Sequence, residues 1–191
     1  MGSLKSSWSR IEKWHKMNVT EVPEDEFMLS PGTTAEALDE AESELGLKLP
    51  KDVRDSYRIH NGSGHHAIFE YGFHLLSLDE AVSTWKMWRG HVEQGLFDNS
   101  HPSPKGPIKK TWWNVKWLPI THNSGGDHQC IDMDPDKRGH VGQVIRFSHE
   151  VGPVEVLAPS FEHWLLRFAE GLEAGKYRFD EEDLWIVPVE S

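Results

Sequence analysis

Residues 128–147 read HQCIDMDPDKRGHVGQVIRF, and this stretch decides the fold. Cys130 and Asp132 alternate with Ile131 and Met133, a period of two that is typical of a β-strand. The following DPD tripeptide favours a turn, because aspartate caps its own turn and proline fixes φ. The chain then returns along HVGQVIRF, which reads as a second strand. The stretch therefore predicts a strand, a turn and a neighbouring antiparallel strand.

Further elements are predicted on both sides of this pair. Strands are expected at 115–121 and 154–158, and a strand with alternating apolar residues at 67–73. Capping boxes at Thr33 with Glu36, and at Ser77 with Glu80, mark two helix starts. Gly46 is placed to end the first of these helices. The helices are predicted over residues 4–17, 33–45, 51–60, 77–94 and 160–172.

This order of elements predicts the fold class and the domain organisation. Helices, then neighbouring strands with short links, then a helix indicate an α+β domain with a mostly antiparallel twisted sheet on which the helices pack. We expect an arm of helix and loop at 1–32, one α+β domain at 33–175, and a tail at 176–191 that contributes an edge strand. The residues 95–110 read as a long loop. The core is predicted to include Trp117, Ile131, Phe161 and Trp164.

Composition limits the classes of partner. The chain has 191 residues, 37% of them hydrophobic, which is enough for a packed core. The net charge of −11 argues against binding a nucleic-acid backbone and allows a basic protein partner. A single cysteine, Cys130, excludes a disulfide framework and suits a reducing compartment. Without a signal-peptide pattern or an apolar run of spanning length, we expect a cytoplasmic protein that does not enter a membrane.

The aspartates after the first strand raise the question of a metal. Asp132, Asp134 and Asp136 match the first three ligand positions of a calcium loop. Lys137 then occupies the glycine position and Gln143 the position of the bidentate glutamate, so the pattern fails. A strand end and its turn explain the same residues better, and we expect no bound metal or other cofactor.

Catalytic patterns are equally incomplete. The twelve histidines are scattered, and the neighbours His65 and His66 would point to opposite faces of a strand. There is no GxSxG elbow, GxGxxG motif or P-loop in the sequence, and Cys130 lies among apolar residues. The sequence therefore favours a non-enzymatic protein with no catalytic residues. The competing hypothesis is a metal-dependent hydrolase that uses the histidines with Asp127, Asp132 or Asp134.

Several motifs follow one another in a fixed order: ESELGLKLP at 42–50, LPKDVRDSYRIHNG at 49–62, WLPI at 117–120, Gly126-Asp127, CIDMDP at 130–135, Gly139, Val144-Ile145 and APSF at 158–161. Together they resemble the SUKH superfamily, which includes fungal cell-wall assembly regulators and many bacterial immunity proteins. The resemblance covers about residues 34–172. Val53 and Ser56 replace the more usual aromatic or apolar residues, and the 95–110 loop is long.

The resemblance implies an α+β fold, no established catalytic centre and a function in protein binding. Bacterial members typically neutralise toxins by direct binding, so the first expectation is an immunity protein for a basic, nuclease-type toxin encoded nearby. A regulatory scaffold of the fungal cell-wall type is the alternative. Two surfaces could meet a basic partner. The preferred one, which we call the sheet-end turn, comprises Asp127, His128, Asp134 and Asp136, with His65 and His66 nearby. The other, the acidic helix face, comprises Glu36, Asp39, Glu40 and Glu44.

Overall fold

A four-stranded antiparallel sheet lies at the centre of the computed structural model, which describes residues 2–19 and 29–189. Its strand order is β2-β4-β5-β6. The register places Cys130 opposite Ile145 on one side and Pro119 on the other, so the strand pair predicted within 128–147 is confirmed. The bounds are β2 Trp117–Pro119, β4 His128–Asp132, β5 Gln143–Ser148 and β6 Gly152–Ala158.

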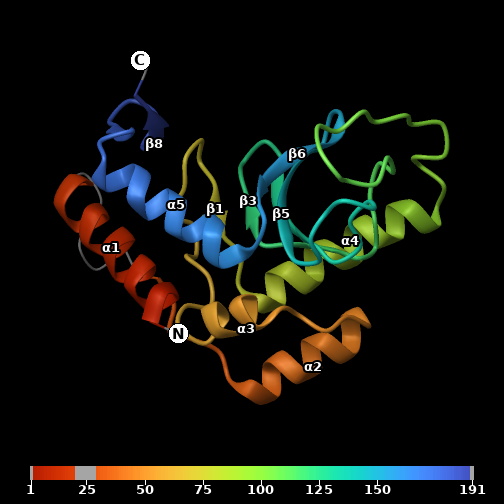
Figure 1. The fold of residues 1–191 in the computed structure, drawn as a ribbon, viewed down its shortest axis with the longest axis horizontal. Coiled ribbons are helices and arrows are strands. Elements are labelled where there is room, and N and C mark those ends of the chain that lie inside the picture. Colours follow the sequence, from red (N-terminus) through yellow and green to blue (C-terminus); the bar gives the residue numbers. More distant parts are fainter. Residues whose placement is uncertain (1, 20–28, 190–191) are drawn as a thin grey trace.

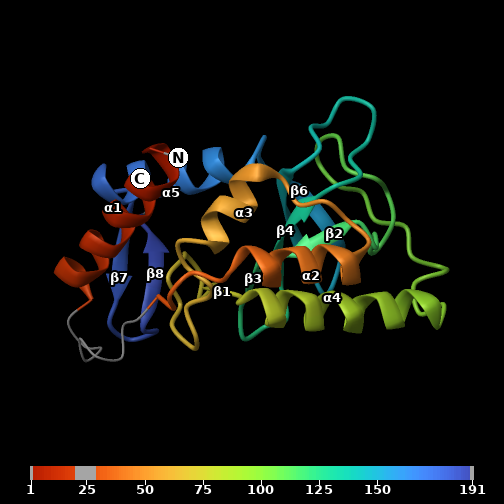
Figure 2. The ribbon, with the colours of Figure 1, turned by 90° about the horizontal axis from the view of Figure 1, so that it is seen from below.

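The described ranges contain five helices, of which α4 and α5 pack on this sheet, and the α+β prediction is confirmed. Figure 2 shows α2 and α4 running side by side, and α4 also packs against β2. Figure 1 shows α1 along α5, and α5 reaches β5 and β6. All five residues of β4 are buried, so both faces of the sheet centre are covered. The helices are α1 Gly2–Asn18, α2 Ala35–Leu45, α3 Lys51–Tyr57, α4 Leu78–Glu93 and α5 Phe161–Glu173.

The helix caps lie where the sequence predicts them, except that the N-cap of α2 is shifted by one residue. Ser77 and Glu80 form the predicted capping box, and Gly46 ends α2 in the left-handed conformation at φ 65°. The N-cap of α2 is Thr34 and not Thr33, because the Thr34 hydroxyl accepts the hydrogen bond from the Ala37 N–H. The Thr33 N–H instead donates to the Tyr57 carbonyl at 2.9 Å, which ties the start of α2 to the end of α3.

The strand predicted at 67–73 is wrong. These residues form a loop with a tight turn at Tyr71 and Gly72, whose φ angles are 60° and 76°, and the Phe69 N–H donates to the Phe73 carbonyl. Alternating apolar residues here serve a loop that buries Phe69 and Phe73. The nearest strand is β1 (His74–Leu75), which pairs with β3 (Thr121–His122).

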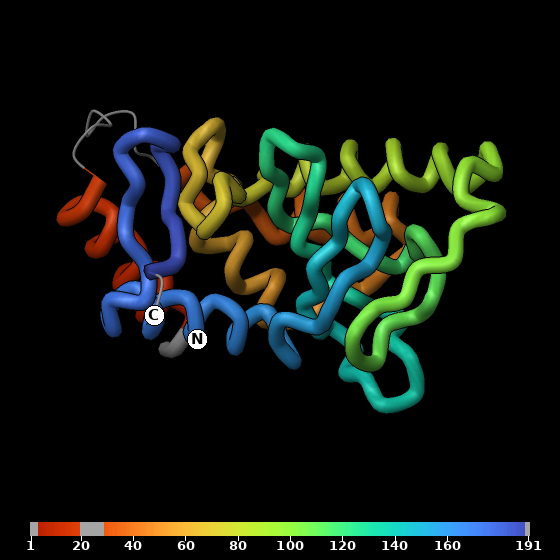
Figure 3. Tube along the Cα trace, turned by 90° about the horizontal axis from the view of Figure 1, so that it is seen from above, coloured from red at the N-terminus to blue at the C-terminus, as the bar shows by residue number. Residues whose placement is uncertain are grey.

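Both chain ends contribute to the packed structure. The α1 helix buries Leu4, Trp8 and Ile11 in the core, and the Trp8 indole N–H donates to the Ser56 hydroxyl at 2.9 Å. The tail forms a hairpin of β7 (Tyr177–Asp180) and β8 (Trp185–Pro188), a two-stranded sheet separate from the central one. Figure 3 shows this hairpin at one end of the molecule and the 95–110 loop at the other. Most of the predicted 18–32 loop, residues 20–28, lies outside the described residues.

The predicted core is confirmed: Trp117 and Ile131 are 0% exposed, Phe161 2% and Trp164 6%. In the described part of the chain, no helix combines the length and apolar character that crossing a membrane requires.

Candidate functional site

The aspartate at the centre of the CIDMDP motif is used inside the protein. Asp132 is fully buried, and its Oδ1 accepts hydrogen bonds from the Trp117 indole N–H and the Asp134 backbone N–H, both at 2.9 Å. Its Oδ2 accepts from the Gln143 side-chain amide at 2.9 Å. Burial raises the pKa of Asp132 above its ordinary value, while these bonds favour the carboxylate. In a calcium loop the Asp132 oxygens would face the ion. Here they accept hydrogen bonds that hold two strands and a turn together.

The LPKD motif has a similar internal role. Asp52 Oδ1 accepts from the Val53 N–H at 3.0 Å, and Oδ2 accepts from the Glu162 N–H at 3.0 Å. One carboxylate thus joins the N-terminal ends of α3 and α5, which lie 110 residues apart in sequence. Buried Glu42 accepts from the Leu49 N–H and pairs with Arg54 at 2.9 Å. These motif residues define the fold and are not free to meet a partner.

The sheet-end turn predicted from sequence does not exist as one surface. Asp127 precedes β4, whereas Asp134 and Asp136 follow it, so the strand separates them by about 20 Å at roughly 3.3 Å per residue. Asp134 forms an ion pair with Lys109 at 2.6 Å and accepts from the Asn114 amide at 3.0 Å. Asp136 is exposed and accepts from the Lys137 N–H in its own turn. The expected carboxylate cluster is therefore divided between two ends of the sheet.

His128 lies in the interior and cannot contact a partner. It is 1% exposed, its Nδ1 donates to the Thr121 carbonyl at 2.9 Å, and its Nε2 accepts from the Trp88 indole N–H at 3.1 Å. Because a carbonyl only accepts and an indole N–H only donates, the ring must be neutral with its proton on Nδ1. Burial accordingly lowers the pKa of His128 to about 4.

The remaining residues at the Asp127 end are mostly accessible. Asp127 Oδ1 accepts from the His149 backbone N–H at 3.0 Å and lies 2.9 Å from His149 Nδ1. Burial alone would raise the pKa of Asp127, but these contacts outweigh it and lower the pKa. His65 is exposed and His66 half-buried, and both lie in the 61–73 loop and not in a strand.

The acidic helix face exists, but half of its charge is already paired. Asp39 forms an ion pair with Arg54 at 2.8 Å, and Glu44 pairs with Lys86 of α4. Glu40 and Glu44 also line a shallow pocket of about 260 Å³ between α2 and α4. Exposed ion pairs of this kind contribute little stability, so the face remains a solvated acidic stripe.

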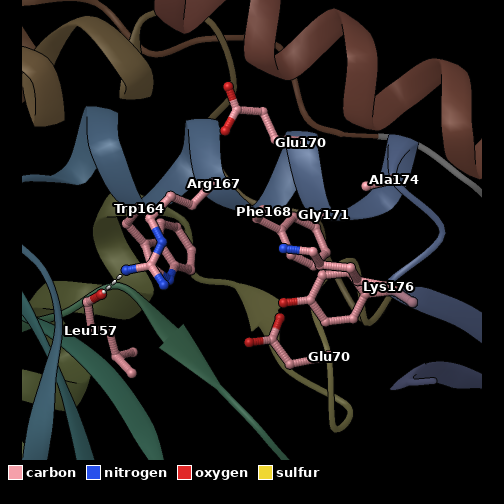
Figure 4. Close-up of a pocket in the computed structure, with 10 residues that line it drawn as sticks. Glu70, Leu157, Trp164, Arg167, Phe168, Glu170, Gly171, Ala174 and Lys176 are labelled. Atoms are coloured by element: carbon pink, nitrogen blue, oxygen red, sulfur yellow. Dashed lines mark hydrogen bonds between the residues drawn. The ribbon is translucent and has the colours of Figure 1, made fainter. Parts of the chain in front are cut away.

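A pocket of about 480 Å³ lies between α5, the start of β7 and the 61–73 loop, and the sequence did not reveal it. We call it the α5 pocket. Trp164 and Phe168 come from α5, Tyr177 from β7 and Glu70 from the loop. Figure 4 shows the Glu70 carboxylate across the pocket from α5, with Arg167 beside Trp164 at the far end. The full lining is Glu70, Leu157, Trp164, Arg167, Phe168, Glu170, Gly171, Ala174, Lys176 and Tyr177.

Two ionisable side chains of this pocket, Glu70 and Tyr177, have raised pKa values. Glu70 forms no ion pair with any residue in the described ranges, and burial raises the pKa of its carboxyl group. Burial, and secondly the charge of nearby Glu70, raise the pKa of Tyr177. A half-buried carboxylate in a partly aromatic concavity is the kind of group that ligand sites use for orientation and specificity.

Sequence reasoning missed this pocket because Glu70 and Tyr177, two of its polar groups, are 107 positions apart, in segments read as a strand and a tail. One local sign was available. Gly171 lies within a helix, and a Cβ there would meet the Tyr177 ring at 2.5 Å, so the glycine marks a close approach. Among the described residues, no group of three or more His, Cys, Asp or Glu side chains is arranged to hold a metal ion.

Comparison with known proteins shows which family the chain belongs to. The model of the SMI1 / KNR4 family (SUKH-1) matches residues 32–167, more than half of the chain. The chain belongs to the SMI1/KNR4 family. The match includes the Asp52 and Asp132 networks, and it ends within α5 before the hairpin.

Relatives extend the similarity beyond these bounds. The chain is 29% identical to the cell wall biosynthesis/cell cycle regulator smi1 of Schizosaccharomyces pombe, over 94% of this chain and 38% of that protein. It is 26% identical to the glucan synthesis regulatory protein of Neurospora crassa, over 94% of this chain and 40% of that protein. The cell wall assembly regulator SMI1 of Saccharomyces cerevisiae is 25% identical, over 93% and 42%. The chain thus spans about two fifths of the length of these relatives.

Proposed function

We propose that this SMI1/KNR4-family chain is a non-enzymatic binding domain that acts in the regulation of cell-wall synthesis. The observation that carries the proposal is the set of relatives: proteins named as regulators of the cell wall or of glucan synthesis align with more than nine tenths of this chain. The immunity role expected first from sequence has no comparable support among these names, so the regulatory reading takes its place.

The arrangement of charges supports a binding role. The carboxylates of the family motifs, Glu42, Asp52 and Asp132, are engaged in hydrogen bonds that hold elements together. Accessible acidic groups include those of the acidic helix face and of the α5 pocket, together with Asp136 in its turn. With a net charge of −11, this surface would attract a basic partner protein and speed its encounter.

A chimera tests the proposal. In the Schizosaccharomyces pombe relative, the segment that aligns with this chain is replaced by the chain, and growth is measured in the presence of a wall-damaging dye and a glucan-digesting enzyme. If the proposal holds, the chimera restores resistance relative to a strain that lacks the segment.

The control is the same chimera carrying Leu165→Ala, which removes a fully buried side chain and should weaken rescue by lowering the stability of the domain. A chimera that is expressed and folded at the level of the natural protein, yet leaves the strain as sensitive as the deletion, contradicts the proposal.

A further inference from the structure

The walls of the α5 pocket are fixed before any ligand arrives. Trp164 and Phe168 are four residues apart on α5 and therefore share one face of the helix. Phe69 packs behind both, with ring centroids 4.6 Å from Trp164 and 5.1 Å from Phe168. The Tyr177 ring packs on Phe168 at 5.3 Å, and the absence of a side chain at Gly171 permits its close approach. A pre-formed aromatic wall loses little conformational entropy on binding.

The backbone that carries the Glu70 carboxylate is also held in place. Glu70 forms an isolated parallel bridge with Ile186 of β8, and the next N–H, that of Tyr71, donates to the Ile186 carbonyl at 2.9 Å. Tyr71 adopts φ 60°, a conformation that is unfavourable for a residue with a side chain. Backbone strain of this kind persists where the surrounding structure enforces it, and it is concentrated at functional sites.

No cationic side chain in the described ranges forms an ion pair with this carboxylate, and this includes Lys176, which lines the pocket and is exposed. The positive charge of Arg146 acts to lower the pKa of Glu70, against the larger effect of burial, but Arg146 forms an ion pair with Glu155 at 2.6 Å. Arg167 lines the pocket but donates to the Leu157 carbonyl at 2.9 Å, and Figure 4 shows its guanidinium group beside Trp164, away from Glu70. The carboxylate therefore remains available for a cation supplied from outside.

We propose that the α5 pocket binds an arginine side chain of a partner protein, with Glu70 accepting the guanidinium hydrogen bonds and the rings of Trp164, Phe168 and Tyr177 covering its planar face and methylene stem. A guanidinium group suits this site because it forms two parallel hydrogen bonds with a carboxylate and stacks on aromatic rings. The volume of about 480 Å³ admits the whole side chain. This inference rests on the proposed binding function and names the chemistry of the partner.

The direct test is an NMR titration of the ¹⁵N-labelled protein with N-acetyl-arginine methylamide. Saturable shifts are expected for the Glu70 and Gly171 amides and the Trp164 indole N–H, with a dissociation constant in the millimolar range. The citrulline counterpart has the same shape without the charge and should bind at least tenfold more weakly. Equal binding of both compounds, or no saturable shifts at these three groups, overturns the proposal.

Agmatine separates a protein-borne arginine from a free guanidinium compound, because it lacks the peptide groups. If agmatine bound at least tenfold more tightly than the blocked arginine, the pocket would be a small-molecule site and the proposed partner would be wrong. Comparable or weaker binding of agmatine supports a protein segment.

Two matched variants identify the carboxylate responsible. Glu70→Gln should reduce affinity for the blocked arginine at least tenfold, whereas Glu170→Gln should change it less than twofold. Glu170 also lines the pocket, but Figure 4 shows its carboxylate pointing away from Glu70. The dispersion of the amide spectrum establishes that both variants are folded. Equal affinities in the two variants overturn the assignment to Glu70.

The chimera distinguishes failure of this inference from failure of the proposed function. Rescue by the unaltered chain but not by its Glu70→Gln form supports both. Rescue by both forms, with no arginine binding in the titration, overturns the pocket and leaves the regulatory function standing. Arginine binding without rescue by the unaltered chain contradicts the regulatory function alone.

Discussion

At the scale of single residues, Asp132 shows how a carboxylate with the appearance of a metal ligand serves the fold. Its three hydrogen-bond donors belong to β2, the β4–β5 turn and β5. A buried donor that loses its acceptor costs about 1–3 kcal/mol, and such costs accumulate where several donors share one group. The alternation of Asp132, Asp134 and Asp136 thus reflects a strand end, as the sequence indicated.

Asp132→Ala should therefore lower the free energy of unfolding by about 3 kcal/mol or more, because the Trp117 and Gln143 N–H groups lose their acceptor in the interior. Asp136→Ala is the matched control, since Asp136 is exposed, and it should cost less than about 1 kcal/mol. Urea unfolding of the three proteins measures both effects. A loss below 1 kcal/mol for Asp132→Ala would show that the network does not stabilise the sheet.

His128 gives stability a defined pH dependence. Its pKa is about 4 in the folded protein against 6.5 as the ordinary value, so the unfolded chain binds a proton more readily between these limits. The histidine therefore contributes its full stability above about pH 7, and the contribution falls as the pH drops from about 6.5 towards 4. The loss should reach about 3 kcal/mol.

Urea unfolding between pH 7.5 and 5 measures this slope in the wild type and in His128→Gln. Buried His15, whose pKa is also lowered to about 4 by burial, adds a similar term in both proteins. The variant should be less stable at pH 7.5 and show a shallower decline with falling pH. Parallel curves would remove His128 as a source of the acid sensitivity.

At the scale of secondary-structure elements, α5 is the main support of the molecule, because it contacts α1, α3, β5 and β6 and forms one wall of the α5 pocket. Leu165 is 0% exposed on this helix, while the neighbouring Leu166 is only half-buried. The two leucines therefore allow one substitution to be compared on two faces of the same helix.

Leu165→Ala should lower the free energy of unfolding by about 2–5 kcal/mol, since it leaves a cavity in the core. Leu166→Ala should cost clearly less, because its side chain is already partly in water. Thermal and urea unfolding provide the comparison. Equal losses would mean that the helix does not present the face that we describe.

Helices were predicted correctly from sequence where a helical repeat of apolar residues followed an N-cap residue. The Ser77–Glu80 box and the Ser160 start located α4 and α5 from sequence. It failed at 67–73, because alternating apolar residues can fill a core from a loop, and because the turn depends on Tyr71 adopting a positive φ that its residue type does not suggest. The contact that stabilises this turn, with Ile186, is remote in sequence.

At the scale of the whole molecule, the fold was predictable and the candidate sites were only partly so. Resemblance and strand order gave the α+β class, and the four carboxylates of the acidic helix face lie on one helix as expected. The sheet-end turn failed because residues close in sequence on either side of β4 are held apart by the strand itself. The α5 pocket could not be predicted from sequence, because Glu70 and Tyr177 come together only through tertiary packing.

The packing of α1 on α5 has a consequence for synthesis on the ribosome. Arg10 pairs with Glu173 at 2.5 Å, and 163 residues separate these partners. At about 5–20 residues per second, translation takes about 8 to 30 s to connect them. During that interval α5 is missing, and the apolar stripe of Leu4, Trp8 and Ile11 is covered only in part, through the contact of α1 with α3. A nascent chain would therefore present a ready binding site for chaperones until α5 emerges.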